Sequence, residues 1–237
     1  MERLGHRLAN LVIAVATGLG ILALVLPLFL NPVWVGFEQG RSEAAAWTGF
    51  READLRAATD AILADLVVGP PDFDVEVAGE AVLNEREQAH MRDVRGVFIA
   101  FFAMALGTVA AAAVITARRG RSGAAETWRA IRTGALGLIV VLIAVGGAAV
   151  LAFDLLFEVF HRLFFAGGSY TFDPLTERLV QLFPFQFWQE SAMAVGIVAI
   201  VVAAVVAVIA NRRLERSIAA ARVDVPSSSV VTGEVVG

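Results

Sequence analysis

Residues 96–117 read GVFIAFFAMALGTVAAAAVITA, an uncharged stretch that lies between Arg95 and Arg118. As an α-helix, such a stretch would extend about 33 Å, enough to cross the hydrocarbon core of a bilayer, which is about 30 Å thick. Three further uncharged stretches of similar length predict three more spans, at residues 8–30, 133–153 and 191–211. The sequence therefore predicts an all-α membrane protein with four transmembrane helices.

The overall composition agrees with this prediction and excludes several kinds of site. Hydrophobic residues make up 58% of the 237 residues and charged residues only 18%, whereas soluble domains carry about 25% charged residues. Because the chain has no cysteine, disulfides, thiolate metal sites and cysteine nucleophiles are excluded. All 19 basic residues are arginine, and the net charge of −4 gives no argument for nucleic-acid binding.

The distribution of arginine predicts which segments face the cytoplasm. The short loop 118–132 holds five arginines and one acidic residue, and the C-terminal segment 212–237 holds four more arginines. In contrast, residues 31–95 hold six arginines against thirteen acidic residues, and residues 154–190 hold two against five. Since cytoplasmic segments are enriched in basic residues, we expect the first two segments and residues 1–7 to be cytoplasmic, with a disordered C-terminal end. The two acidic segments are then expected to form an extracellular cap.

The first cap segment contains signals for two helices. Apolar residues recur at mostly three- and four-residue steps between Trp47 and Leu66, which predicts an amphipathic helix. Alternating apolar and acidic residues predict a short extended piece at residues 73–77. A second helix is expected to begin near Asn84 and to continue into the following span, which puts His90 near the outer membrane surface.

The second cap segment, residues 154–190, holds ten of the chain's 21 aromatic residues and also His161. An aromatic belt at the level of the lipid headgroups is the simpler interpretation. Ten aromatic residues in one short segment favour something more, namely a semi-buried cap or a pocket for an apolar ligand.

His90 and His161 are the candidate site residues because both are expected at a similar depth on the outer side. Glu87 and Asp93 lie three residues to either side of His90, and Glu158 lies three residues before His161. Residues at this spacing share a helix face, and a carboxylate there can fix the tautomer of an imidazole and raise its basicity. Two other interpretations exist: a lone histidine near a membrane is more often a hydrogen-bonded interface residue, and Glu-x-x-His also occurs in di-metal sites. The metal interpretation is disfavoured because the spans supply no further carboxylates.

Two motifs in these segments resemble signatures of the lipoprotein intramolecular transacylase family. The first is Glu85-Arg86-Glu87-Gln88-Ala89-His90-Met91-Arg92-Asp93-Val94-Arg95. The second is Phe160-His161-Arg162-Leu163-Phe164-Phe165, followed by Thr171-Phe172-Asp173-Pro174, Leu182-Phe183-Pro184 and Phe187-Trp188. The resemblance covers residues 1 to about 215 in order and spacing. The chain departs from the family pattern near Tyr170 and Glu177, where a tryptophan and an aspartate are expected.

The resemblance implies a four-span acyltransferase of the bacterial cytoplasmic membrane, with both termini inside and an extracellular cap. The implied reaction moves the acyl chain at the sn-2 position of an S-diacylglyceryl lipoprotein to the amine of its N-terminal cysteine. No cofactor and no metal is needed for that reaction. The implied partners are diacylglyceryl-modified lipoproteins and membrane lipids.

The family's two catalytic histidines correspond to His90 and His161. We expect one of them to act as a general base and the other as a general acid, in an order that the sequence does not assign. Glu87, Asp93 and Glu158 are expected to orient the two imidazoles.

Other residues have expected roles around the histidines. Arg92 or Arg162 is expected to contact an oxyanion or a phosphate. The expected substrate pocket is lined by seven aromatic residues: Phe164, Phe165, Tyr170, Phe172, Phe183, Phe187 and Trp188. Two alternative functions remain open, namely a non-enzymatic membrane protein that binds a lipid or protein partner through the aromatic segment, and a metal-dependent membrane hydrolase.

Overall fold

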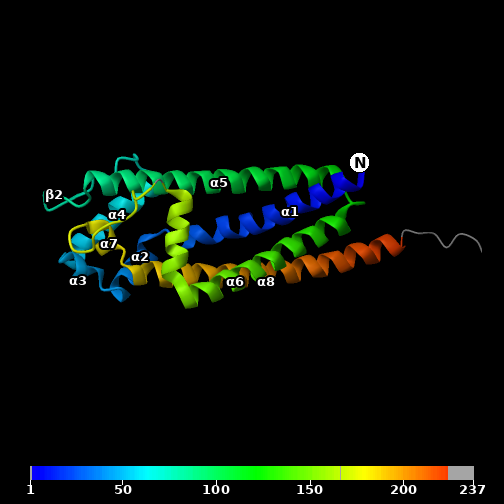
Figure 1. Ribbon diagram of the computed structural model, residues 1–237. Coiled ribbons are helices and arrows are strands. Elements are labelled where there is room, and N and C mark those ends of the chain that lie inside the picture. Colours follow the sequence, from blue (N-terminus) through cyan, green and yellow to red (C-terminus); the bar gives the residue numbers. More distant parts are fainter. Residues whose placement is uncertain (1, 166, 224–237) are drawn as a thin grey trace, which may run out of the picture.

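The computed structural model describes residues 2–165 and 167–223. Four long helices form an elongated bundle, and the shorter elements gather at one of its ends (Figure 1). The long helices are α1 (Glu2–Val25), α5 (Glu85–Arg119), α6 (Ala124–Phe164) and α8 (Phe185–Val223). Each carries one of the four hydrophobic stretches, and each is long and apolar enough to cross a membrane.

The shorter elements form what we call the cap, residues 31–84 and 167–184. A 3₁₀ turn at Leu26–Leu28 extends α1 toward it. The elements of the cap are α2 (Pro32–Arg41), α3 (Ala44–Thr48), α4 (Glu52–Val67), β1 (Glu76–Val77), β2 (Glu80–Ala81) and α7 (Arg178–Leu182). The two strands pair antiparallel, with Glu76 opposite Ala81.

The structure corrects two details predicted for the first cap segment. The single helix expected from Trp47 to Leu66 is divided, because Gly49 adopts a left-handed conformation (φ 68°) that ends α3 before α4 begins. The expected extended piece is shorter than predicted, because Phe73 also has a positive φ and the strand begins only at Glu76. Helix α2 was not predicted.

The core of the cap joins residues that are far apart in the sequence. Apolar residues of α4 belong to one buried cluster with residues at the start of α5, in α7 and at the start of α8; the most buried include Leu55, Ala58, Ile62, Phe73, Leu83, Leu182 and Phe187. The start of α5 is therefore held by the cap core as well as by the bundle.

Small residues allow the long helices to approach closely. Helix α1 packs against α5, α6 and α8, and α6 packs against α8. Ala199, Ala203 and Ala207 recur every four residues along α8 and are buried. A Cβ atom added to Gly134 of α6 would lie 2.8 Å from the Cα atom of Ala14 on α1 and closer still to the Ala14 carbonyl oxygen. The contact between α1 and α6 thus requires glycine at position 134.

Gly134→Ala is expected to reduce the free energy of unfolding by about 1–3 kcal/mol, because the new methyl group forces α1 and α6 apart. Gly137→Ala on the same helix is the matched control, since a Cβ atom there meets nothing within 4 Å. Thermal unfolding of both purified variants in one detergent checks this. A Gly134→Ala protein that unfolds at or above the temperature of the control would contradict the tight contact.

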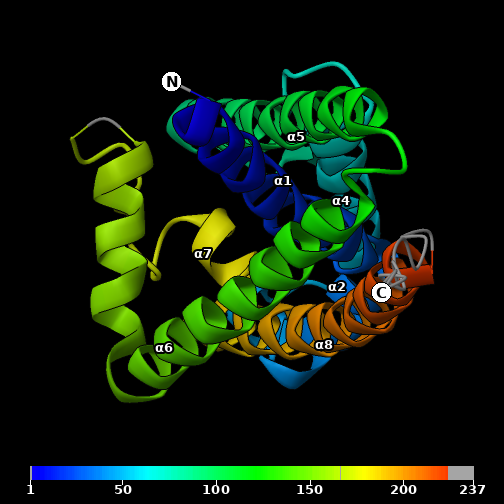
Figure 2. The same ribbon diagram turned by 90° about the vertical axis from the view of Figure 1, so that its right-hand side faces the viewer.

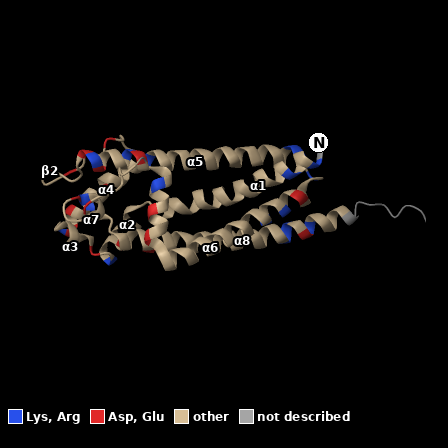
Figure 3. Cartoon of the chain, viewed as in Figure 1, with Lys and Arg blue, Asp and Glu red and all other residues tan. Residues whose placement is uncertain are grey.

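Helix α6 changes direction before it reaches its end. Ala152 has non-helical backbone angles (φ −154°, ψ 58°), and beyond it the helix runs across the bundle instead of along it (Figure 1). Charged residues lie at the two ends of the bundle and on this crossing part of α6, whereas the stretches between are uncharged (Figure 3). The kink brings the last turn of α6 toward the start of α5.

Helix α8 continues past residue 211 to Val223, so the first part of the predicted C-terminal segment is helical. The end that we expected to be disordered lies outside the described residues.

Candidate active site

The start of α5 is fixed by a buried carboxylate. Asn84 caps the helix by accepting hydrogen bonds from the backbone N–H groups of Arg86 and Glu87. Glu87, only 1% exposed, accepts from the N–H of Asn84 (2.8 Å) with one carboxylate oxygen and from the N–H of Leu179 (2.6 Å) with the other. Glu87 therefore joins the N-terminus of α5 to that of α7 and fixes the position of His90, one turn further along.

His161 lies in the last turn of α6 and has a defined tautomer. Its Nδ1 atom is 2.7 Å from the carbonyl oxygen of Phe157. Because a carbonyl oxygen can only accept, Nδ1 must carry the hydrogen, and the neutral ring then has its lone pair on Nε2. The backbone thus supplies the orienting contact that we expected from Glu158.

The two histidines lie next to each other. Their ring centroids are 6.1 Å apart and the ring planes differ by 22°. His90 is 6% exposed and His161 is 9% exposed. The Nδ1 atom of His90 is buried and has no hydrogen-bond partner within residues 2–165 and 167–223. The site thus combines one imidazole held by the backbone with one whose polar atom is unpaired.

Aromatic side chains enclose the pair. Phe165 contacts both rings, with its centroid 4.8 Å from that of His90 and 5.4 Å from that of His161. Phe172 lies 5.3 Å from His90, and Tyr170 lies 5.1 Å from His161. These three were among the predicted pocket residues.

The other four predicted pocket residues lie elsewhere. Phe164 packs on Phe160 and is half exposed. Phe183 and Phe187 belong to the cap core, and both contact Trp188. Within the described residues, none of these four rings makes an aromatic contact with either histidine.

Two aromatic residues that contact His161 were not among the predicted pocket residues. Phe157 and Phe160 lie 4.1 Å and 5.4 Å from His161 by ring centroids. Phe157 is four residues before His161, so the helical spacing of side chains could have identified it.

The predicted charged residues have other partners. Glu158 accepts from Arg162 Nε (2.7 Å) and from the hydroxyl of Tyr170 (3.2 Å), so it holds Tyr170 against His161. Arg92 donates to the backbone carbonyl of Asp72 (3.0 Å). Asp93 is exposed. Within the described part of the chain, no group of three or more His, Cys, Asp or Glu residues converges as a metal site would require.

Arg86 and Glu177 hold the loop that carries Phe172. The Arg86 guanidinium binds both carboxylate oxygens of Glu177 (2.5 and 2.6 Å) and lies 4.9 Å from the centre of the Phe172 ring. Burial alone would raise the pKa of Glu177. The hydrogen bonds from Arg86, from the backbone N–H of Asp173 and from Asn84 outweigh burial, so this pKa is lowered. Sequence reasoning missed this pair, because its two members are 91 positions apart.

Glu177→Gln is expected to lower the free energy of unfolding by about 1–2 kcal/mol near neutral pH, since a charge-assisted pair is lost and Arg86 is half exposed. A carboxyl with a lowered folded-state pKa stabilises only while ionised. Its contribution is complete above the ordinary carboxyl pKa of about 4.3 and is lost as the pH falls through the lowered value. The difference between wild type and variant should therefore shrink in acid.

Unfolding midpoints of wild type and variant across this pH range check the prediction, with Glu80→Gln as the exposed control. A difference that stays constant down to about pH 3 would show that the Glu177 carboxylate does not stabilise the fold through its charge.

Comparison with known proteins identifies a family that matches this chain and a solved structure with a similar fold. The family model described as Lipoprotein intramolecular transacylase Lit matches residues 11–188. The structure resembles the membrane integral lipoprotein intramolecular transacylase Lit from Bacillus cereus, with a TM-score of 0.72 at 16% identity over 92% of this chain and 98% of that chain. A comparison with curated proteins gave no match.

Two variants of the Bacillus cereus protein, in which a histidine is replaced by alanine or arginine, also match at 16% identity. Their TM-scores are 0.72 and 0.69, over 92% and 94% of this chain and 97% and 96% of theirs. The family match includes both histidines and most of the cap, and it covers more than half of the chain. This chain therefore belongs to the lipoprotein intramolecular transacylase family and is a membrane-integral acyltransferase.

Proposed function

We propose that the protein moves the sn-2 acyl chain of an S-diacylglyceryl lipoprotein to the amine of the lipoprotein's own N-terminal cysteine, with His90 and His161 as the catalytic pair. One observation carries this proposal. The two imidazoles are stacked 6.1 Å apart inside an aromatic enclosure where the cap meets α5 and α6.

The reaction balances without a cofactor. The amine nitrogen forms a bond to the sn-2 carbonyl carbon through an eight-membered ring, and the bond from that carbon to the glyceryl oxygen breaks. One proton leaves the amine and one reaches the glyceryl oxygen. The product carries an N-acyl group and an S-monoacylglyceryl group. Because an amide is more stable than an ester, the transfer is downhill, and the protein has only to position the groups and move protons.

His161 is the general base in this proposal. The hydrogen bond from its Nδ1–H to the Phe157 carbonyl leaves Nε2 as the atom that accepts a proton from the attacking amine. The same hydrogen bond stabilises the imidazolium that then forms, as a carboxylate does in a catalytic triad.

His90 is the general acid in this proposal. Its ring contacts Phe165 and Phe172, and its Nδ1 atom has no hydrogen-bond partner within the described residues. A ring N–H in this dry enclosure is free to donate a hydrogen bond to the developing oxyanion, and it passes its proton to the glyceryl oxygen as that oxygen leaves. In the same step the His161 imidazolium returns the amine's proton to the other nitrogen of His90, so both rings end neutral. Glu87 acts at a distance, by fixing the turn of α5 on which His90 lies.

The aromatic enclosure folds the substrate for attack. The diacylglyceryl group is flexible, and holding its carbonyl against the amine supplies several kcal/mol of the barrier. Phe165 touches both histidines and forms the wall shared by the two proton-transfer sites.

The cap is placed on the extracellular side of the bacterial cytoplasmic membrane in this proposal. The support is the distribution of arginine, since the end of the bundle opposite the cap carries the arginine-rich loop 118–132. Diacylglyceryl-modified lipoproteins are anchored in the outer leaflet, where the crossing part of α6 would meet them.

A synthetic lipopeptide with different acyl chains at sn-1 and sn-2 tests the proposal. Tandem mass spectrometry should find only the sn-2 chain on the cysteine nitrogen after incubation with the purified protein. If two lipopeptides that differ in peptide and in acyl chains are mixed, no crossed product should form. An N-acyl group taken from sn-1, or crossed products, would overturn the proposal.

A further inference from the structure

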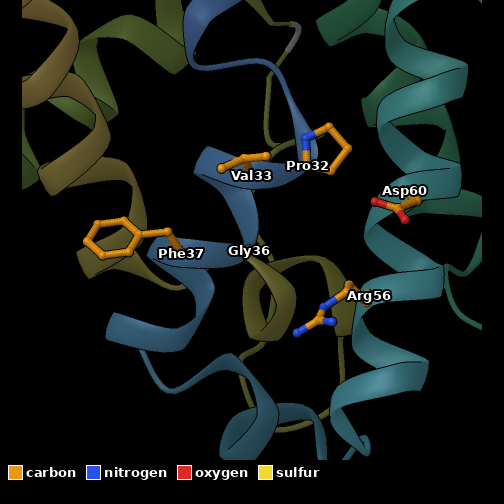
Figure 4. A pocket seen from close by; sticks show the side chains of 6 residues that line it. All are labelled: Pro32, Val33, Gly36, Phe37, Arg56 and Asp60. Atoms are coloured by element: carbon orange, nitrogen blue, oxygen red, sulfur yellow. The ribbon is translucent and has the colours of Figure 1, made fainter.

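A groove runs between α2 and α4, on elements that the proposed reaction does not use. A cavity of about 500 Å³ is lined by Pro32, Val33, Gly36, Phe37, Arg56 and Asp60. A smaller cavity of about 50 Å³ shares Gly36 and Arg56 with it and continues along the same two helices to Gly40 and Glu52. Figure 4 shows Arg56 and Asp60 projecting from α4 toward α2 across this space.

The charges along the groove alternate in sign. Glu52, Arg56 and Asp60 follow each other at four-residue steps on α4 and therefore share one face of the helix. All three are exposed, and Arg56 and Asp60 form no ion pair within residues 2–165 and 167–223. A single guanidinium between two carboxylates matches a ligand that carries both a negative and a positive charge.

Helix α2 forms the floor of the groove, and its two glycines are not required by packing inside the protein. Gly36 and Gly40 lie in helical α2, where glycine is less favourable than alanine. A Cβ atom added to either glycine would meet nothing within 4 Å, so neither is required by packing or by a positive φ. Their effect is to leave the groove open.

The groove lies where the bundle meets the cap. Pro32 lies two residues after the end of the first hydrophobic stretch, and Val33 is 83% exposed. Viewed along the bundle, α4 and α2 lie beyond α1, between α5 and α8 (Figure 2). A lipid standing beside these helices would bring its headgroup to the groove and its glyceryl carbons to Pro32 and Val33.

We propose that this groove binds the headgroup of a phosphatidylethanolamine from the membrane leaflet on the cap side. Arg56 binds the phosphate, and Asp60 and Glu52 accept from the ammonium. Arg56 and Asp60 are four residues apart on one face of α4, so the two side chains can reach the neighbouring charges of one headgroup. Phosphatidylglycerol lacks the positive charge, and the choline nitrogen of phosphatidylcholine has no N–H to donate. The proposal depends on neither His90 nor His161.

Native mass spectrometry of the purified protein in detergent, with each lipid added separately, measures the binding. We expect phosphatidylethanolamine to bind about 10- to 100-fold more tightly than phosphatidylglycerol or phosphatidylcholine. The double variant Arg56→Gln/Asp60→Asn is expected to lose this preference. Gly36→Leu is expected to abolish binding by filling the groove, whereas Gly36→Ala should retain it.

Transacylase activity in detergent is the folding control, because none of these residues belongs to the catalytic machinery. If activity is intact, equal binding of all three lipids overturns the proposal. A preference for phosphatidylethanolamine that survives Gly36→Leu overturns it as well, since the lipid would then bind elsewhere. Inactivity of the wild-type protein would bear on the proposed reaction alone.

Discussion

His161→Asn is expected to slow formation of the N-acyl product by about 10²- to 10⁴-fold, the range that a positioned general base contributes. Asparagine has a similar size and still offers an N–H to the Phe157 carbonyl, but it has no basic nitrogen to accept the proton of the attacking amine. The measurement is the initial rate with a synthetic diacylglyceryl lipopeptide. His6→Asn is the matched control, since His6 is exposed and contacts Glu126 at the far end of the bundle. A His161→Asn protein as fast as the control would remove His161 from the mechanism.

The separate roles of the two histidines predict different responses to the leaving group. His90→Asn is expected to lose activity by a similar factor on the natural ester, because the glyceryl oxygen must be protonated to leave. A thiolate leaves without protonation, so an sn-2 thioester analogue should restore much of the rate of His90→Asn. The same analogue should not rescue His161→Asn. Rescue of both variants, or of His161→Asn alone, would contradict the assigned order.

The second large effect is expected on stability. Glu87→Ala should lower the free energy of unfolding by about 2–4 kcal/mol. The carboxylate is buried and accepts from the backbone N–H groups of Asn84 and Leu179, both of which lose their partner in the variant. The N–H of Leu179 is buried, and a buried unpaired N–H costs about 1–3 kcal/mol; the loss of the part-buried hydrogen bond from Asn84 adds to this. The variant should also be less active, because the turn that carries His90 is no longer tied to α7.

Glu85→Ala separates this effect from the general preference for acidic residues at a helix N-terminus. Glu85 lies in the same first turn of α5 but is exposed, so its loss should cost only about 0.3–1 kcal/mol. Thermal unfolding of both variants in one detergent measures whether Glu87→Ala is more destabilising than Glu85→Ala. Equal destabilisation would mean that Glu87 acts only through the helix dipole.

The hydrophobic stretches predict the bundle well for a physical reason. A bilayer requires about 20 apolar residues with a fully hydrogen-bonded backbone, and few other patterns satisfy that requirement. Helix α5 could also be predicted at its cap end, because Asn84 followed three residues later by Glu87 forms a capping box. Helix α2 carries two glycines and no buried apolar stripe of normal width, so its periodicity gives no signal.

The candidate site was predicted in part. The spacing of His90 and His161 relative to the spans indicated that both lie at one end of the bundle, where they are stacked. The contacts that orient them could not be predicted. The partner of His161 is a backbone carbonyl, which every residue has, and one partner of Glu87 is the N–H of Leu179, 92 positions away. Side-chain type alone suggested that the nearby carboxylates would pair with the histidines, whereas in the fold Glu87 binds backbone N–H groups and Glu158 binds Arg162 and Tyr170.

The most direct test of the central claim uses a reporter lipoprotein in a bacterial host that lacks this activity. Intramolecular transfer produces an isomer, so intact mass does not change, and the N-terminal lipopeptide must be fragmented. We expect an N-acyl, S-monoacylglyceryl peptide when the native chain is expressed, and an unchanged S-diacylglyceryl peptide with His90→Asn/His161→Asn. An unchanged S-diacylglyceryl peptide from well-expressed native protein, or an N-acyl product from the double variant, would contradict it.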